Sequence, residues 1–193
     1  ALLETEEIVE QNFPVLQRRL PKEISFIHTQ DLEDRWPELP VKDREHRAAR
    51  ELGAYFLVGI GGKLKSGNRH DARAADYDDW ITINEEGKMG LNGDIIVHDQ
   101  TRDRALELSS MGIRVSPESL DAQLKEMGLE DRKSLEFQSG VLDGSIPLSV
   151  GGGIGQSRLC MLLLHKSHLG EVQASVWPQD MIEEYRKSGV EFL

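Results

Sequence analysis

The residues that decide the fold are Gly151-Gly152-Gly153-Ile154-Gly155-Gln156-Ser157-Arg158-Leu159-Cys160-Met161. The apolar residues just before them predict the end of a strand, and the apolar run 161–164 after them predicts a buried helix. We expect a strand, a tight glycine turn and a helix, an arrangement that brings backbone close to a ligand because glycine lacks a Cβ. The N-terminal end of the helix favours an anion. Arg158 lies about one turn into that helix and adds a planar charge suited to phosphate.

The common phosphate-binding signatures do not fit this stretch. The Walker loop requires a lysine after its last glycine, but Gln156 follows Gly155. The pair Gly62-Lys63 lacks the upstream glycine, and Gln156 also occupies the third glycine position of the dinucleotide signature G-x-G-x-x-G. An alternative without a ligand is a glycine-rich turn that only permits close packing.

Composition limits the class of protein. The chain has 193 residues, 38% of them hydrophobic, and a formal net charge of −11. This length suits one domain or a large part of one. Such an acidic chain is a poor general binder of nucleic-acid backbone, so no nucleic-acid partner is expected. No apolar run is long enough to cross a bilayer and no signal peptide is recognisable, so we expect a cytoplasmic protein with no membrane partner. The single cysteine, Cys160, is expected to pack in the core.

Hydrophobic patterning predicts a mixed chain of short strands and helices. Thr29 is expected to cap a helix that ends at residue 36, and the charges of a helix over 41–52 are expected to face solvent. The other expected helices span residues 2–20, 116–128, 131–139 and 156–165. The expected strands span residues 24–28, 54–60, 91–97, 105–115, 148–152 and 173–177.

Polar residues interrupt two of these apolar strands. Asp94 lies within one strand, and Glu107, Ser110 and Arg114 lie within the next. Unbroken alternation would place Glu107 on one face and Ser110 and Arg114 on the other. A single buried polar residue is often a satisfied core group. Four on an expected hairpin favour a ligand-binding floor.

Two loop segments add charges to this floor. Residues 61–73 contain four cations, Lys63, Lys65, Arg69 and Arg73, together with His70. This loop is either an exposed turn or a lid that folds over anionic groups. Residues 76–80 contain three carboxylates, which either form a solvated acidic turn or meet an ammonium group or a metal ion.

Several stretches together resemble the ammonia-dependent asparagine synthetases, also called aspartate–ammonia ligases, which are relatives of the class II aminoacyl-tRNA synthetases. The resemblance is ordered and nearly free of gaps from about residue 24 to residue 178. It rests on F-L-V-G-I-G-G-K-L (56–64), R-H-D-A-R-A-A-D-Y-D-D-W (69–80), G-L-N-G-D-I (90–95), E-L-S-S-M-G-I-R-V (107–115), G-G-G-I-G-Q-S-R-L (151–159) and Q-A-S-V-W-P (173–178).

The resemblance implies an α+β fold, with an antiparallel sheet flanked by helices. It implies that the aspartate side-chain carboxylate attacks the α-phosphorus of ATP to give β-aspartyl-AMP and pyrophosphate. Ammonia then displaces AMP and leaves asparagine. The cofactors implied are ATP and Mg²⁺.

The resemblance also implies roles for seven residues. Arg158, Asp94 and Glu107 would hold ATP, and the last two would also hold Mg²⁺. Arg73, Asp78, Ser110 and Arg114 would hold aspartate, with the arginines on its carboxylates and Asp78 on its amino group. Arg158, Asp78 and Arg114 would take part in catalysis.

The resemblance places residues 1–193 in the C-terminal part of a single class II catalytic domain, because proteins of this family are much longer than this chain. The full-length protein would be a homodimer. Two rival functions share some of these residues. One is the catalytic core of an aspartyl- or asparaginyl-tRNA synthetase, which would need an RNA-binding domain. The other is a non-catalytic relative that binds an amino acid or AMP.

Overall fold

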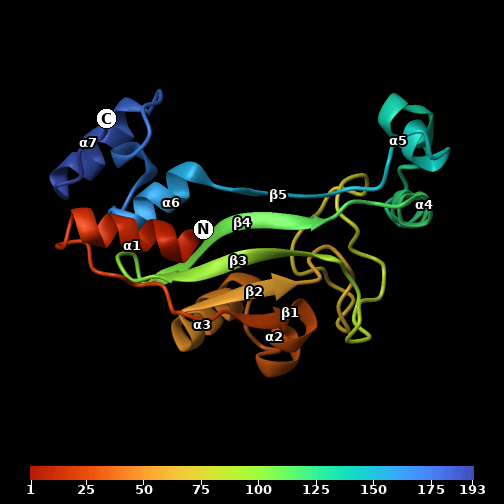
Figure 1. The fold of residues 1–193 in the computed structure, drawn as a ribbon, viewed down its shortest axis with the longest axis horizontal. Helices are drawn as coiled ribbons and strands as arrows, with labels where there is room; N and C mark the ends of the chain where they lie inside the picture. The colour runs from red at the N-terminus through yellow and green to blue at the C-terminus, as the bar shows by residue number, and fades with distance from the viewer.

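The computed structural model describes all residues, 1–193, and is built on a five-stranded sheet of order β1-β2-β3-β4-β5 (Figure 1). The strands are β1 (Ser25–His28), β2 (Ala54–Val58), β3 (Asn92–Asp99), β4 (Arg104–Ile113) and β5 (Val150–Ile154). Three neighbouring pairs are antiparallel, from β2 to β5, whereas β1 runs parallel to β2. The expected α+β fold with an antiparallel sheet is therefore confirmed, except that the edge strand β1 is parallel to its neighbour.

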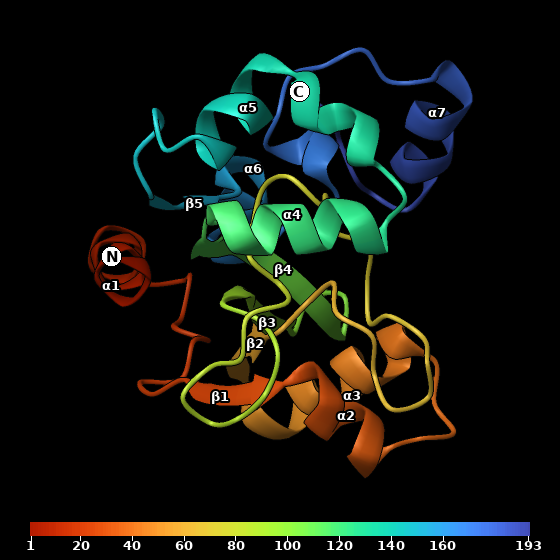
Figure 2. The same cartoon turned by 90° about the vertical axis from the view of Figure 1, so that its right-hand side faces the viewer.

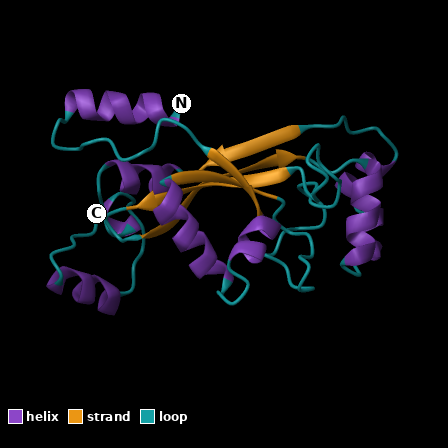
Figure 3. Cartoon of the chain, turned by 90° about the horizontal axis from the view of Figure 1, so that it is seen from below, coloured by secondary structure: helices purple, strands orange, loops and turns teal.

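Helices cover the sheet and both of its ends. The α-helices are α1 (Leu2–Asn12), α2 (Thr29–Arg35), α3 (Val41–Leu52), α4 (Pro117–Glu126), α5 (Glu136–Leu142), α6 (Gln156–Leu163) and α7 (Gln179–Lys187). Two short 3₁₀ helices are η1 (Glu130–Ser134) and η2 (Leu169–Glu171). Helices α2 and α3 lie below the sheet in Figure 1, while α1, α6 and α7 gather at one end and α4 and α5 at the other. Figure 3 shows the same separation from below. No helix is long and apolar enough to cross a membrane.

Each face of the sheet has its own hydrophobic core. Under α2 and α3, Tyr55, Leu57 and Ile96 of the sheet pack with Leu32 and other helix residues. On the opposite face, the sheet packs with Met161 and Leu162 of α6. A third cluster centres on Trp80 and the apolar residues of α4 and α5, and it stabilises the loops at that end of the sheet. Fully burying one such large apolar side chain is worth about 1.5–3 kcal/mol.

Several local predictions are wrong, and each has a physical reason. His28, not Thr29, caps α2, because its ring Nδ1 accepts the Gln30 N–H at 3.0 Å. The first helix ends at Asn12, just before the backbone turns toward Pro14. Residues 173–177 form no strand.

Two burial predictions are also wrong. Helix α3 does end at Gly53 as expected, with φ of +73° at that glycine. Its charges do not all face solvent, because Arg44 and Glu45 are buried against neighbouring loops. Cys160 is exposed on α6 rather than packed in the core.

Candidate functional site

The strand expected up to residue 152 continues to Ile154, so the tight glycine turn that the sequence predicted before the helix is wrong. Gly151, Gly152 and Gly153 lie within β5, and none of them has a positive φ. A Cβ on Gly151 would lie 2.6 Å from Nη2 of Arg114. A Cβ on Gly153 would have no neighbour within 4 Å. Glycine is therefore needed for the close approach of an arginine at position 151, and leaves open space beside the strand at position 153.

A β-bulge brings the polar strand residues onto one face. Asp94 pairs with Ser110, but the register shifts so that Ile96 pairs with Glu107, which leaves Leu108 as the extra residue of β4. Residues directly opposite each other in an antiparallel pair share a face, and Glu107 lies opposite Ile96. Ile96 points to the same face as Asp94, two residues earlier, so Glu107 shares a face with Asp94 and Ser110. The expectation from unbroken alternation, which separated Glu107 from Ser110, is wrong for this reason.

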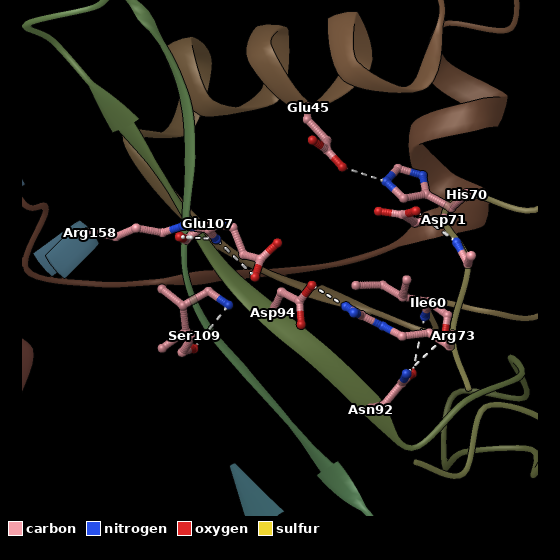
Figure 4. A network of polar contacts seen from close by, with 12 residues as sticks. Glu45, Ile60, His70, Asp71, Arg73, Asn92, Asp94, Glu107, Ser109 and Arg158 are labelled. Atoms are coloured by element: carbon pink, nitrogen blue, oxygen red, sulfur yellow. Dashed lines mark hydrogen bonds and ion pairs between the residues drawn. The ribbon is translucent and has the colours of Figure 1, made fainter. Parts of the chain in front are cut away.

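We call the face of β3 and β4 that carries Asp94, Glu107 and Ser110 the floor. At one end of this floor, Arg158 of α6 contacts Glu107 (Figure 4). Its Nη1 donates to the Glu107 carbonyl oxygen at 3.1 Å and lies 3.2 Å from the carboxylate Oε1. The Arg158 side chain is 46% exposed, so its guanidinium remains accessible. A groove of about 520 Å³ lies beside it, lined by residues of β4, β5, α6 and η2. Because the groove is open and its wall includes Gly153 and the first residues of α6, it suits an anion that approaches backbone.

In the middle of the floor, Asp94 forms an ion pair with Arg73 (Figure 4). Asp94 is only 4% exposed, and its Oδ1 is buried without a hydrogen-bond partner. Burial raises the pKa of Asp94, the charge of Glu107 adds to this, and Arg73 opposes it. An unpaired buried carboxylate oxygen is costly unless a ligand or ion completes it. Asp94 is thus the residue of the floor that has an unsatisfied hydrogen-bond acceptor.

At the far end, Arg114 forms an ion pair with the buried Asp78. The guanidinium of Arg114 also lies 3.9 Å from the ring centroid of Tyr77, and its Nη2 donates to the Tyr77 hydroxyl at 3.1 Å. Tyr77 escaped the sequence interpretation, although its place between two aspartates of the acidic stretch is a usable signal. Arg114 is therefore held by the Asp78 carboxylate and the Tyr77 ring, and it packs against the backbone of β5 at Gly151.

The other two acidic residues of 76–80 stabilise their own loop and its contact with the neighbouring helices. Asp79 accepts from Thr82 at 2.9 Å (N–H) and 2.7 Å (Oγ1), so it stabilises its own turn. Asp76 accepts from Gln138 at 2.7 Å and pairs with Arg132 at 3.2 Å. Asp78 is thus the carboxylate of this stretch that faces the floor.

Most cations of the 61–73 loop are paired with carboxylates away from the floor. Lys63 and Arg69 contact Glu126 of α4, at 3.9 Å and 2.5 Å. Arg73 alone of the loop cations contacts the floor. His70 contacts the buried Glu45 of α3 at 2.9 Å (Figure 4). The lid remains a prediction, because the loop is seen in one conformation.

The structure thus brings the seven predicted residues to one face of the sheet and its adjoining loops. From Glu107 to Arg114 the floor runs roughly 20 Å, at about 3.3 Å per strand residue. No group of three or more His, Cys, Asp or Glu side chains is placed to hold a metal ion. Two carboxylates, Asp94 and Glu107, do lie close together, and this fits Mg²⁺, which usually takes one or two protein carboxylates with phosphate and water.

The sequence profile of the family described as aspartate-ammonia ligase matches residues 1–189. The chain belongs to this family. A curated relative, the aspartate–ammonia ligase of Parabacteroides distasonis, is 49% identical over 190 residues, which are 98% of this chain and 55% of the relative. Our chain therefore spans about half the length of that relative.

Among solved structures, similar folds occur in aminoacyl-tRNA synthetases. The asparaginyl-tRNA synthetase of Pyrococcus horikoshii is 16% identical with a TM-score of 0.62, covering 92% of this chain and 44% of that one. The aspartyl-tRNA synthetase of Entamoeba histolytica is 17% identical with a TM-score of 0.55, covering 87% and 34%. At this identity the likeness concerns the fold, which is that of class II synthetase catalytic domains.

Proposed function

We propose that the protein containing this chain makes asparagine from aspartate, ammonia and ATP, through β-aspartyl-AMP, and releases AMP and pyrophosphate. One observation supports this best. This chain, which belongs to the aspartate-ammonia ligase family, has an arginine–carboxylate pair at each end of the floor, Arg158 with Glu107 and Arg114 with Asp78. The pairs suit a phosphate chain at one end and a small dicarboxylic acid at the other.

The nucleotide would occupy the groove at Arg158. The exposed guanidinium and the free N–H groups of the first turn of α6 suit the phosphates, while Gly153 leaves room for them. Asp94 and Glu107 would hold Mg²⁺, which neutralises charge on the phosphates when it is bound. The partnerless Oδ1 of Asp94 supports this assignment.

Aspartate would lie between Arg73 and Arg114. Each guanidinium has five N–H donors, so an arginine already paired with a protein carboxylate retains donors for a substrate carboxylate. Asp78 can accept hydrogen bonds from the substrate ammonium group. Ser110, halfway between the two ends, can donate its hydroxyl to the reacting carboxylate.

The chemistry then follows from placement. An oxygen of the aspartate β-carboxylate bonds to the α-phosphorus while the bond to pyrophosphate breaks, and the arginines stabilise the developing charge. Ammonia next attacks the acyl carbon and AMP leaves, with one proton released from the nitrogen. The exposed Cys160 has no part in this scheme.

Four further proposals accompany the activity. Residues 1–193 are part of one class II catalytic domain; the complete protein is a homodimer; it works in the cytoplasm; and it needs neither nucleic acid nor a membrane. A gel-shift assay with tRNA at physiological salt distinguishes the proposed activity from the rival function as a tRNA synthetase.

The direct test is asparagine and AMP formation by the protein expressed from its full reading frame. Both products should appear only when aspartate, ammonia and ATP are supplied together, and in equal amounts. AMP formation without ammonia-dependent asparagine would refute the proposal, as would binding of aspartate without turnover. The latter result would indicate the non-catalytic relative.

A further inference from the structure

Gln123 of α4 is a completely buried amide, with 0% exposure, and its side chain hydrogen-bonds to backbone of the loop 75–80. Its Nε2 donates to the carbonyl oxygens of Ala75 at 2.9 Å and Asp78 at 3.1 Å. Its Oε1 accepts the N–H of Trp80 at 2.8 Å. One side chain therefore satisfies three backbone groups: the carbonyl oxygen of Asp78 itself, one group before Asp78 and one after it.

We propose that Gln123 is a positioning residue for the amino-acid end of the site, because it fixes the backbone that presents Asp78 to Arg114. This inference rests on the proposed function, since it concerns the affinity for aspartate. Helix α4 and the loop 75–80 lie at the end of the sheet opposite α6, and Figure 2 shows α4 beside the loops there. The influence of Gln123 should thus be confined to this end.

Two features of the surroundings make the contact specific. Residues 74–78 belong to no strand, and their β-pairing is limited to an isolated antiparallel bridge between Asp78 and Arg114. Val115 N donates to Tyr77 O at 3.0 Å and Asp79 N to Ile113 O at 2.9 Å, but the carbonyl oxygens of Ala75 and Asp78 accept from the side chain of Gln123. Trp80, two residues after Asp78, is only 1% exposed and packs in the cluster with the apolar residues of α4 and α5. Gln123 adds hydrogen bonds to this packing, which fix the loop in rotation as well as in position.

A matched control lies on the next helix. Gln138 of α5 is also a buried amide, but its Nε2 donates to the Asp76 carboxylate at 2.7 Å and not to backbone. Removal of Gln138 therefore costs a buried hydrogen bond of the same loop without freeing the backbone of Asp78.

The experiment measures the aspartate KM, the ATP KM and kcat of the protein expressed from its full reading frame, with Gln123→Met, Gln123→Glu and Gln138→Met. Methionine keeps the shape and removes every hydrogen bond, so we expect the aspartate KM to rise about tenfold or more. The ATP KM should change less than threefold, because the nucleotide end is remote. Glutamate retains an acceptor for Trp80 and, when protonated, one donor, so Gln123→Glu should fall between the wild type and Gln123→Met. Gln138→Met should keep the wild-type aspartate KM.

Several results would overturn the inference: an unchanged aspartate KM in folded Gln123→Met, a parallel rise of both KM values, or an equal effect of Gln138→Met. If Gln123→Met does not fold, Gln123→Glu decides in the same way. A wild-type protein that forms no asparagine would instead refute the proposed function. In that event the contact of Gln123 with the loop is tested by hydrogen exchange at the Trp80 amide, which Gln123→Met should accelerate and Gln138→Met should not.

Discussion

Replacing Gly151 by alanine should separate folding from aspartate binding. The new methyl would lie 2.6 Å from Nη2, 3.2 Å from Cζ and 3.3 Å from Nε of Arg114, which is closer than these atoms tolerate. All three atoms belong to the end of a flexible side chain, so the guanidinium can swing away while the strand stays in place.

The cost falls on the contacts of Arg114. Swinging away breaks its charged hydrogen bond to Asp78, worth about 1.5–3 kcal/mol, and its stacking on Tyr77, worth about 0.5–1 kcal/mol at an exposed site. Replacing glycine in a strand returns about 0.5–1 kcal/mol. We therefore expect stability to fall by roughly 1–3 kcal/mol, and aspartate affinity to fall about tenfold to a hundredfold.

The assay pairs denaturant unfolding with titration of aspartate by calorimetry. Gly153→Ala is the stability control, since its methyl contacts nothing within 4 Å and should only return the about 0.5–1 kcal/mol of replacing glycine in a strand. If Gly151→Ala binds aspartate as tightly as the wild type, then Arg114 does not contact the amino acid. Loss of folding in Gly151→Ala would instead show that β5 moves and not the arginine.

Substitutions at three other positions probe the rest of the site. Arg158→Ala should weaken ATP binding about tenfold or more and leave aspartate binding unchanged; equal losses for both ligands would contradict the division of the floor. Because burial raises the pKa of Asp94, ionisation of this group costs stability as the pH rises. Asp94→Asn should therefore raise the free energy of unfolding at pH 7, by an amount that shrinks on acidification and vanishes below the ordinary pKa of 3.8; a gain constant with pH would refute this. Tyr77→Phe keeps the ring on Arg114 and loses one hydrogen bond, so the aspartate KM should rise no more than about fivefold, whereas Tyr77→Ala should raise it further.

Local signals predicted the elements that depend on nearby residues. Helix α3 was predicted with its correct bounds, since its run of arginine and glutamate residues and the glycine that ends it, Gly53, lie within the helix or directly after it. Helix α4 was predicted because Ser116 and Pro117 define its start. By contrast, 173–177 has the composition of a strand, but it has no neighbouring strand to pair with in the structure.

The residue types and order of the site were also readable from the sequence, because the motifs occupy short continuous stretches. Their shared face was not. The bulge at Leu108 turns Glu107 toward Asp94, and a bulge is decided by the pairing of two strands rather than by either strand alone. For the same reason the sequence predicted a turn after residue 152, whereas the strand continues, and the tertiary structure requires glycine at Gly151 so that Arg114 fits beside it.

The sequence by itself determined the family, the largely antiparallel fold and the identity of the charged groups, because these depend on motifs within single stretches. The tertiary structure decided which partners those groups take: Arg73 with Asp94, Arg114 with Asp78, and Arg158 with Glu107. Buried charges need a partner from elsewhere in the chain, and only the packing of the strands and loops determines which one comes within reach.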